Sequence, residues 1–189
     1  MAKLILASSS ERRLWLLERI GIKPDLIIPA DIDESQHKKE KNTDYVDRMS
    51  REKLAKVAKD NRGSIIIAAD TIVISRGRIL PKAETDEQVR YCLNSMSGRA
   101  HRVITSVSGI SANQDRIITK KICTRVIFKK LSESEIEAYV LGKEGLGKAG
   151  GYAIQAYADS FVLSLNGSYS NIVGLPLYTT KNILTTLGY

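Results

Sequence analysis

Residues 4–13 read LILASSSERR, a short apolar strand that runs directly into serine hydroxyls and a pair of arginines. The serines stand where a helix should begin, and free backbone N–H groups and the positive dipole end at that point attract anions. An arginine adds a planar fork that grips two oxygen atoms at once. The junction therefore predicts a phosphate-binding site with Ser8, Arg12 and Arg13 as candidates. The alternative is an N-cap serine followed by two surface arginines.

A second apolar strand, residues 64–69, ends on Asp70 and Thr71. An acid just past the carboxyl end of a buried strand lies where open α/β sheets place their ligands. Asp70 could bind Mg²⁺ or accept a proton from an attacking water, and both tasks need an ionised carboxylate at the phosphate. The alternative is a turn-forming aspartate that caps a neighbouring backbone group.

The composition limits the class of protein. The chain has 189 residues, enough for one large domain or two closely fused lobes, and its 43% hydrophobic content is ordinary for a globular protein. No apolar run approaches the ~18 residues of a membrane helix, and nothing suggests export, so we expect a cytoplasmic protein with no membrane partner. Neither cysteine nor histidine spacing suggests a zinc site, a disulfide or a nucleophilic triad.

The net charge of +8 suits an anionic partner, either nucleic acid or nucleotide phosphates. The basic doublets are scattered, however, and no ladder of aromatic side chains accompanies them. We therefore expect these clusters to be solvated basic faces, and charge alone does not decide between the two kinds of partner.

Helical periodicity and caps predict five helices. Two begin with a capping-box pattern, Thr85 with Gln88 and Ser132 with Glu135. The predicted helices span residues 10–21, 43–57, 85–98, 132–142 and 176–187.

The predicted strands alternate with these helices and include hairpins. They span residues 3–7, 25–28, 64–69, 72–75, 78–80, 103–112 and 117–128. Mixed alternation of this kind favours an α/β fold with a mixed, elongated sheet flanked by helices. We expect one domain over 1–189 with two lobes, the second roughly 100–145, and a cleft between them.

An acidic loop and two lysines supply further candidates. Asp33 and Glu34 follow the strand at 25–28 and could add oxygen ligands to a hard cation, although a solvated acidic loop is equally consistent with the spacing. Lys53 and Lys82 could reach the same site. Taken singly, either is more often a surface lysine.

Residues 145–155 read GLGKAGGYAIQ. The glycines could let the backbone approach a ligand closely, and the amide of Gln155 carries the donor and the acceptor that suit the edge of a nucleobase. The alternative is a flexible connector. Residues 167–176 form another loop of small residues that enters the last helix.

Together, these segments resemble the Maf family of nucleoside triphosphate pyrophosphatases. Eight motifs match in order along essentially the whole chain. They are LASSSERR (6–13), DIDES (31–35), REKLAKV (51–57), AADTIV (68–73), ILPK (79–82), MSGRAHRVITSV (96–107), GKAGGYAIQ (147–155) and GSYSNIVGLPL (167–177).

The resemblance implies a cytosolic α/β enzyme with a deep cleft between two lobes, frequently a homodimer. Such enzymes hydrolyse nucleoside triphosphates to monophosphate and pyrophosphate with a divalent cation, Mg²⁺ or Mn²⁺. By the same resemblance, Asp70 is the catalytic proton acceptor. The positions associated with substrate choice are Arg12, Thr71 and Gln155. Those that handle phosphates are Ser8, Arg13, Lys53 and Lys82, and those that handle metal are Asp33, Glu34 and Asp70.

The segment at 148–155 is similar to the subgroup that acts on dTTP and UTP. The chain departs from the family pattern at four places: Glu11 replaces a proline, the ILPK turn has an altered order, Gly147 replaces an acid and Ala156 replaces a glycine. We expect Glu11 to point away from the phosphates. The alternatives are a pyrophosphatase for modified or purine nucleotides and a non-catalytic nucleotide- or DNA-binding regulator of cell division.

Overall fold

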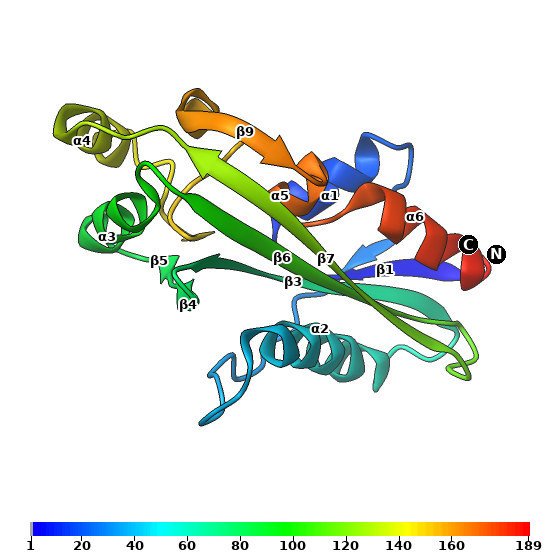
Figure 1. The fold of residues 1–189 in the computed structure, drawn as a ribbon. Helices are drawn as coiled ribbons and strands as arrows, with labels where there is room; N and C mark the ends of the chain where they lie inside the picture. Colours follow the sequence, from blue (N-terminus) through cyan, green and yellow to red (C-terminus); the bar gives the residue numbers. More distant parts are fainter. Residues whose placement is uncertain (1) are drawn as a thin grey trace. The chain divides into compact units, whose positions relative to one another are not determined.

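The structure is a computed structural model that describes residues 2–189 (Figure 1). Its helices are α1 (Glu11–Glu18), α2 (Asn42–Ala58), α3 (Asp86–Met96), α4 (Glu133–Leu141), the 3₁₀ helix η1 (Tyr157–Phe161), α5 (Tyr169–Val173) and α6 (Leu177–Thr186). Its strands are β1 (Lys3–Ala7), β2 (Leu26–Ile27), β3 (Ser64–Ser75), β4 (Arg78–Leu80), β5 (Lys82–Ala83), β6 (Ala100–Ile110), β7 (Ile117–Phe128), β8 (Lys148–Ala149) and β9 (Val162–Asn166).

The strands form a seven-stranded mixed sheet, which confirms the predicted α/β class. The order is β2-β1-β3-β6-β7-β9, and β4 pairs with β3 off this path. β1 is parallel to both β2 and β3, whereas β4 is antiparallel to β3 and β9 is antiparallel to β7. β5 and β8 form a separate two-stranded ribbon. No helix among residues 2–189 is long and apolar enough to cross a membrane.

β3 differs from the prediction because it is one continuous strand of 12 residues. Two separate strands interrupted at Asp70 and Thr71 were expected. The pairing explains the continuity: β1 pairs with β3 as far as Ala68, β4 pairs with it from Val73, and β6 neighbours it in the sheet. Asp70 therefore lies inside β3, two residues beyond the end of its pairing with β1.

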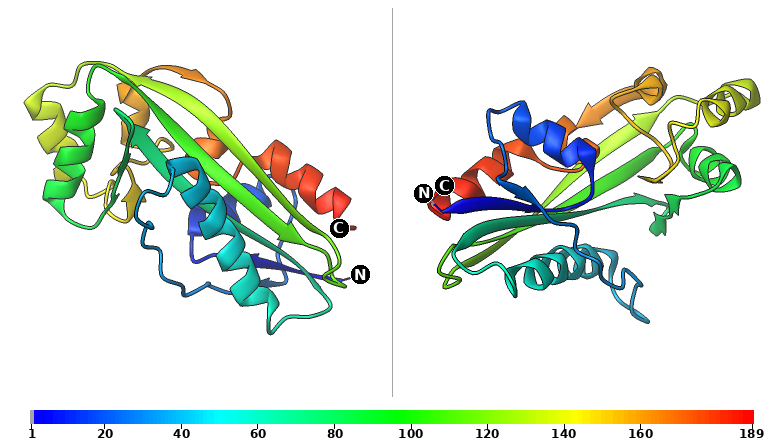
Figure 2. Two further views of the ribbon diagram at one scale, coloured as in Figure 1. Left: turned by 60° about the horizontal axis from the view of Figure 1, so that its bottom comes forward. Right: turned by 180° about the vertical axis from the view of Figure 1, so that it is seen from behind.

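The chain divides into two compact units. Unit 1 comprises residues 1–70, 105–122 and 174–189, and unit 2 comprises residues 71–104 and 123–173. In unit 1, α2 and α6 cover opposite faces of the sheet (Figures 1 and 2). α6 packs so closely that a Cβ at Gly109 would lie 2.8 Å from side-chain atoms of Ile183 and Leu187.

In unit 2, α3 and α4 lie side by side (Figure 2) and are joined by Arg90 and Glu137. The guanidinium donates two hydrogen bonds to the carboxylate, of 2.6 and 2.8 Å. The capping box predicted at the start of α4 is present. At α3 only half of the predicted box forms, since the side chain of Gln88 accepts from the N–H of Glu84 instead of from Thr85.

Candidate active site

A lysine ammonium between two carboxylates forms the centre of the site in unit 1. Nζ of Lys53 donates to Oδ1 of Asp70 at 2.6 Å and lies 2.8 Å from Oε1 of Glu34. Lys53 is 8% exposed and Asp70 is 7% exposed. The side chain of Glu34 is half exposed, so the cluster is open to solvent on that side. Charges buried to this degree are stable only when they are paired and hydrogen-bonded, as these are.

The alternation of side chains along β3 directs Asp70 toward α2. Ile66 and Ala68, which precede it at intervals of two residues, pack against Leu54 of α2. Successive side chains of a strand point to opposite faces, so Asp70 continues the row that faces α2. Lys53 lies on that helix, next to Leu54. The acid predicted from the β3 motif and the lysine predicted from α2 therefore meet.

The serine–arginine junction folds partly as predicted. Nη1 of Arg13 donates to Oγ of Ser8 at 3.1 Å, and Nε of Arg13 donates to the carbonyl of Gly174 at 2.9 Å. Ser8 also accepts from the N–H of Ser10 at 3.1 Å. Ser10 is the N-cap residue of α1, as predicted, but its side chain makes no cap hydrogen bond. Glu11, the first residue of α1, is exposed to solvent.

Arg13 shares the electrostatic environment of the two carboxylates. Burial lowers the pKa of its guanidinium, while the negative charges of Asp70 and Glu34 act to raise that pKa. An arginine starts from so high a pKa that it stays charged. The structure thus brings together five of the residues predicted from sequence. They are Ser8, Arg13, Glu34, Lys53 and Asp70.

Asp33 engages a different partner from its neighbour Glu34. Its Oδ1 accepts from the backbone N–H of Ser35 and its Oδ2 accepts from the hydroxyl of Ser35, both at 2.9 Å. These hydrogen bonds lower the pKa of Asp33. Both carboxylate oxygens therefore take part in shaping the loop that carries Glu34.

Two residues of α2 that sequence reasoning missed hold this loop. The hydroxyl of Tyr45 donates to the carbonyl of Glu34 at 2.7 Å, and Arg48 donates to the carbonyl of Ser35 at 2.9 Å. Arg48 also makes two hydrogen bonds to Glu40, of 2.7 and 2.8 Å, which lower the pKa of Glu40 to about 2. Burial, and then the charges of Asp70 and Glu34, raise the pKa of Tyr45 to about 12.

The signal for these residues was present in the sequence. Positions 45, 48 and 52 follow helical spacing and form a polar stripe beside the apolar stripe of α2. Arg48 and Glu52 make an i,i+4 pair at 3.3 Å. The stripe marks the face of α2 that binds the acidic loop.

Three candidates belong to unit 2. Thr71 is half-buried, and its side chain points to the sheet face opposite that of Asp70 because it follows Asp70 in the same strand. Lys82 is exposed in β5, where it pairs with Ala149 of β8. Gln155 is exposed. Arg12, in unit 1, is half-buried on α1.

The glycine-rich segment packs against protein. A Cβ at Gly150 would lie 2.8 Å from Cβ of Val73 in β3, and one at Gly151 would lie 3.1 Å from Cβ of Cys92 in α3. The N–H of Gly150 donates to the carbonyl of Pro81 at 2.9 Å. At these two positions the lack of a Cβ permits close approach to β3 and α3.

The cluster offers a divalent cation two carboxylates, which is the number of protein ligands that such a site commonly uses. Mg²⁺ in phosphate-handling sites takes one or two protein carboxylates and completes its shell with phosphate oxygens and waters. Glu34 and Asp70 supply two carboxylates that already converge on a single positive charge. No group of three or more potential ligands among His, Cys, Asp and Glu is found within residues 2–189.

Comparison with known proteins assigns essentially the whole chain to one family. The family model described as Maf-like protein matches residues 3–187. A dTTP/UTP pyrophosphatase of Zymomonas mobilis is 50% identical over 189 residues, covering 100% of this chain and 93% of that protein. One of Caulobacter vibrioides is 47% identical, covering 98% and 96%. The solved structure of a HAM1 protein from Coxiella burnetii shares the fold with a TM-score of 0.54 at 15% identity, covering 98% of this chain and 100% of that chain.

Proposed function

Because this chain belongs to the Maf family, we propose that it hydrolyses nucleoside triphosphates, with dTTP and UTP preferred, to monophosphate and pyrophosphate. The names of relatives at 50 and 47% identity support both the reaction and the substrates. The observation that carries the proposal is the buried Lys53 ammonium between Asp70 and Glu34, with Arg13 in the field of both acids. Alternating positive and negative groups of this kind can bind a polyphosphate and still hold a carboxylate beside it that acts as a general base.

The proposed step is attack of water on the α-phosphorus. Asp70 accepts one proton as the new P–O bond forms, the bond to the bridging oxygen breaks, and pyrophosphate leaves with that electron pair. Oδ1 of Asp70 accepts from Lys53, which leaves Oδ2 for the proton of the water. The contact with Lys53 also orients this carboxylate.

The phosphate oxygens are bound by groups at the start of α1. Arg13 is held by Ser8 and by the carbonyl of Gly174, so its guanidinium is oriented before substrate arrives. We assign Ser8, Arg13, Lys53 and Lys82 to the phosphates. We assign Arg12, Thr71 and Gln155 to substrate choice.

Glu34 and Asp70 would hold a divalent cation, Mg²⁺ or Mn²⁺. When bound, such a cation supplies neutralisation of the charge on the phosphate oxygens. We assign Asp33 to the same acidic loop in a supporting role, because both of its oxygens accept hydrogen bonds from Ser35. We further propose a homodimer that acts on free nucleotides in the cytoplasm and binds no nucleic acid stably, which light scattering and nucleic acid binding assays would check.

One assay tests the function. Purified protein with Mg²⁺ or Mn²⁺ is given each canonical and modified triphosphate, and pyrophosphate is the readout. We expect Asp70→Asn to fold and to lose ~10²-fold or more in turnover, as is usual for loss of a general base. Asp159→Asn, which removes an exposed carboxylate outside the cluster, should keep full activity.

Each alternative has its own outcome in this assay. Release of orthophosphate would exclude the proposed cleavage site. Turnover confined to purine or modified nucleotides would indicate the related house-cleaning pyrophosphatase. Nucleotide or DNA binding without metal-dependent turnover would indicate the non-catalytic regulator.

A further inference from the structure

Gln155 follows a rigidly buried segment of unit 2. Tyr152, Ala153 and Ile154 are 4%, 4% and 2% exposed, whereas Gln155 is exposed. An exposed amide that directly follows three buried residues has its backbone fixed on one side. The groups that fix this backbone therefore decide where the amide lies.

The first such group is His101 of β6. Its Nε2 lies 2.9 Å from the hydroxyl of Tyr152, and the imidazole is 2% exposed. The two rings are nearly perpendicular, with centroids 5.4 Å apart, and Phe128 packs edge-on against both. Burial lowers the pKa of His101 to about 4 and raises the pKa of Tyr152, so the hydrogen bond joins two neutral groups.

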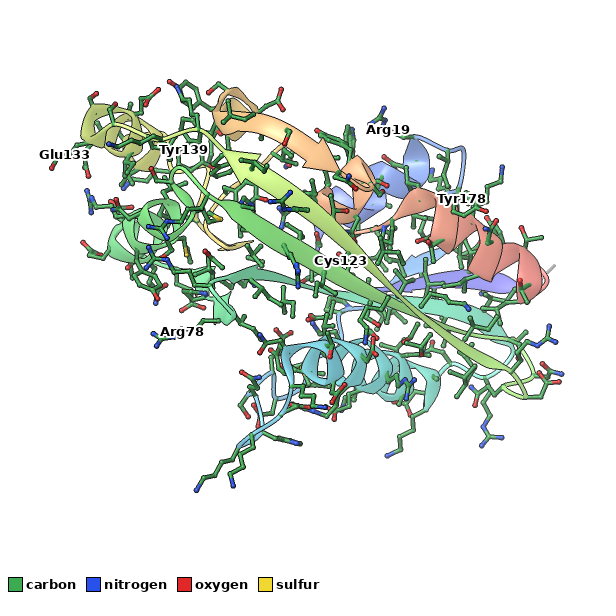
Figure 3. All side chains as sticks on the ribbon, in the orientation of Figure 1. Arg19, Arg78, Cys123, Glu133, Tyr139 and Tyr178 are labelled. Carbon is green, nitrogen blue, oxygen red and sulfur yellow. The ribbon has the colours of Figure 1, made fainter. Side chains whose placement is uncertain are left out.

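The second group is the hydroxyl of Tyr139, which comes from α4 (Figure 3). It accepts a hydrogen bond from the backbone N–H of Ala153 at 3.0 Å. Tyr139 is 2% exposed and packs edge-on against Phe161 with centroids 5.6 Å apart. Consecutive residues of the segment are thus tied to two different elements, β6 and α4.

We propose that His101 and Tyr139 are positioning residues that fix the backbone at Tyr152 and Ala153 and thereby hold the Gln155 amide for recognition of a nucleobase edge. The inference rests on the proposed function and deepens it. An amide that reads a base must present its donor and acceptor in one orientation, which requires that the supporting residues be locked.

The two anchors of the segment are the His101–Tyr152 contact and the hydrogen bond from Ala153 to Tyr139. Each hydrogen bond can be removed by a substitution that keeps the aromatic ring. Tyr152→Phe deletes the hydroxyl that meets His101, and Tyr139→Phe deletes the acceptor of the Ala153 N–H. Tyr157→Phe is the matched control, because Tyr157 belongs to the same aromatic cluster but its hydroxyl is not part of either anchor. Ser132→Ala is a second control, since it weakens α4 at its N-cap while keeping the Tyr139 hydroxyl.

The readouts separate positioning from general stability. For both anchor variants we expect kcat/KM for dTTP and UTP to fall about 5- to 10-fold, the usual effect of one hydrogen bond, through KM more than kcat. Other triphosphates should change less, so the selectivity ratio falls. Hydrogen exchange over residues 148–156 should accelerate. Both controls should keep the wild-type selectivity ratio.

The outcomes that overturn the inference are distinct from those that overturn the proposed function. Anchor variants that exchange faster but keep wild-type selectivity would show that the contacts are only structural. A wild-type enzyme that hydrolyses all triphosphates equally would leave no selectivity for Gln155 to supply and would also overturn the inference. Wild-type protein that releases no pyrophosphate from any triphosphate overturns the proposed function itself, and the inference with it.

Discussion

The two units bury polar groups in opposite ways. In unit 1, Lys53 and Asp70 are buried as an ion pair with an N···O distance of 2.6 Å, and Glu34 is the second carboxylate at the same ammonium. In unit 2, His101 and Tyr152 are even less exposed, and burial shifts the pKa of each in the direction that favours the neutral form. In the function proposed above, the ion pair of unit 1 serves phosphate binding and proton transfer, and the neutral pair of unit 2 holds a backbone segment in place.

Removing the Lys53 ammonium is the most severe test of the cluster formed by Lys53, Asp70 and Glu34. We expect Lys53→Met to lose ~10²-fold or more in turnover, and to lose about 3–5 kcal/mol of unfolding free energy because it leaves Asp70 buried without its ammonium. Turnover and urea unfolding measure the two effects. The double variant Lys53→Met/Asp70→Asn should recover part of the stability but none of the activity. A double variant no more stable than Lys53→Met would contradict the pairing.

Acid should lower the stability of the protein through His101, the imidazole that meets Tyr152 in unit 2. The pKa of His101 is about 4 in the folded protein and 6.5 in the unfolded chain. Between pH 6.5 and pH 4 this imidazole therefore gains a proton in the unfolded chain but not in the folded protein. Stability is therefore complete above pH 6.5 and falls progressively between pH 6.5 and pH 4, by about 3 kcal/mol. Thermal unfolding across this range should show a shallower decline for His101→Phe than for wild type. Identical slopes would refute the role of this imidazole.

The loop contacts of α2 should have a smaller effect. Arg48→Lys loses the paired hydrogen bonds to Glu40, and Tyr45→Phe loses the bond to the carbonyl of Glu34. Each should lower kcat/KM about 5- to 10-fold, because the loop that carries Glu34 is less well held. Steady-state kinetics measures this, with Arg51→Lys, exposed on the same helix, as the control. Unchanged kinetics in both variants would show that Glu34 needs no support from α2.

Loss of the α4 cap should have the smallest effect. Ser132→Ala removes the acceptor of the Glu135 N–H and should cost about 1 kcal/mol in urea unfolding. Turnover should stay within about twofold, because the cap touches neither cluster. A large loss of activity would mean that the end of α4 does more than support Tyr139.

Local patterns predicted those features that local physics determines. The capping box at Ser132 is present, since it depends on residues adjacent in sequence. β1 has the predicted bounds because its apolar run is continuous and is followed directly by the serines. The family assignment and the α/β class are confirmed as well. Asp70 and Lys53 were each identified singly, from a strand end and from a helix motif.

Features that depend on pairing between distant segments were missed. The continuity of β3 through Asp70 comes from β4 and β6, which no pattern within β3 reveals. The hydrogen bonds from Tyr45 and Arg48 to the acidic loop join a helix to a segment without regular structure. The aromatic cluster around His101 assembles side chains from β6, β7 and the segment before η1. Such contacts exist only after the chain has folded.

The position of Lys53 has a consequence for how the protein matures. Many metalloproteins remain unfolded until their ion arrives, because ligands brought together without it repel one another. Here an amine built into α2 already balances Asp70 and Glu34. We therefore expect a newly made chain to complete its core without a divalent ion at Glu34 and Asp70, so that the ion proposed for this site would affect turnover and not the folded population.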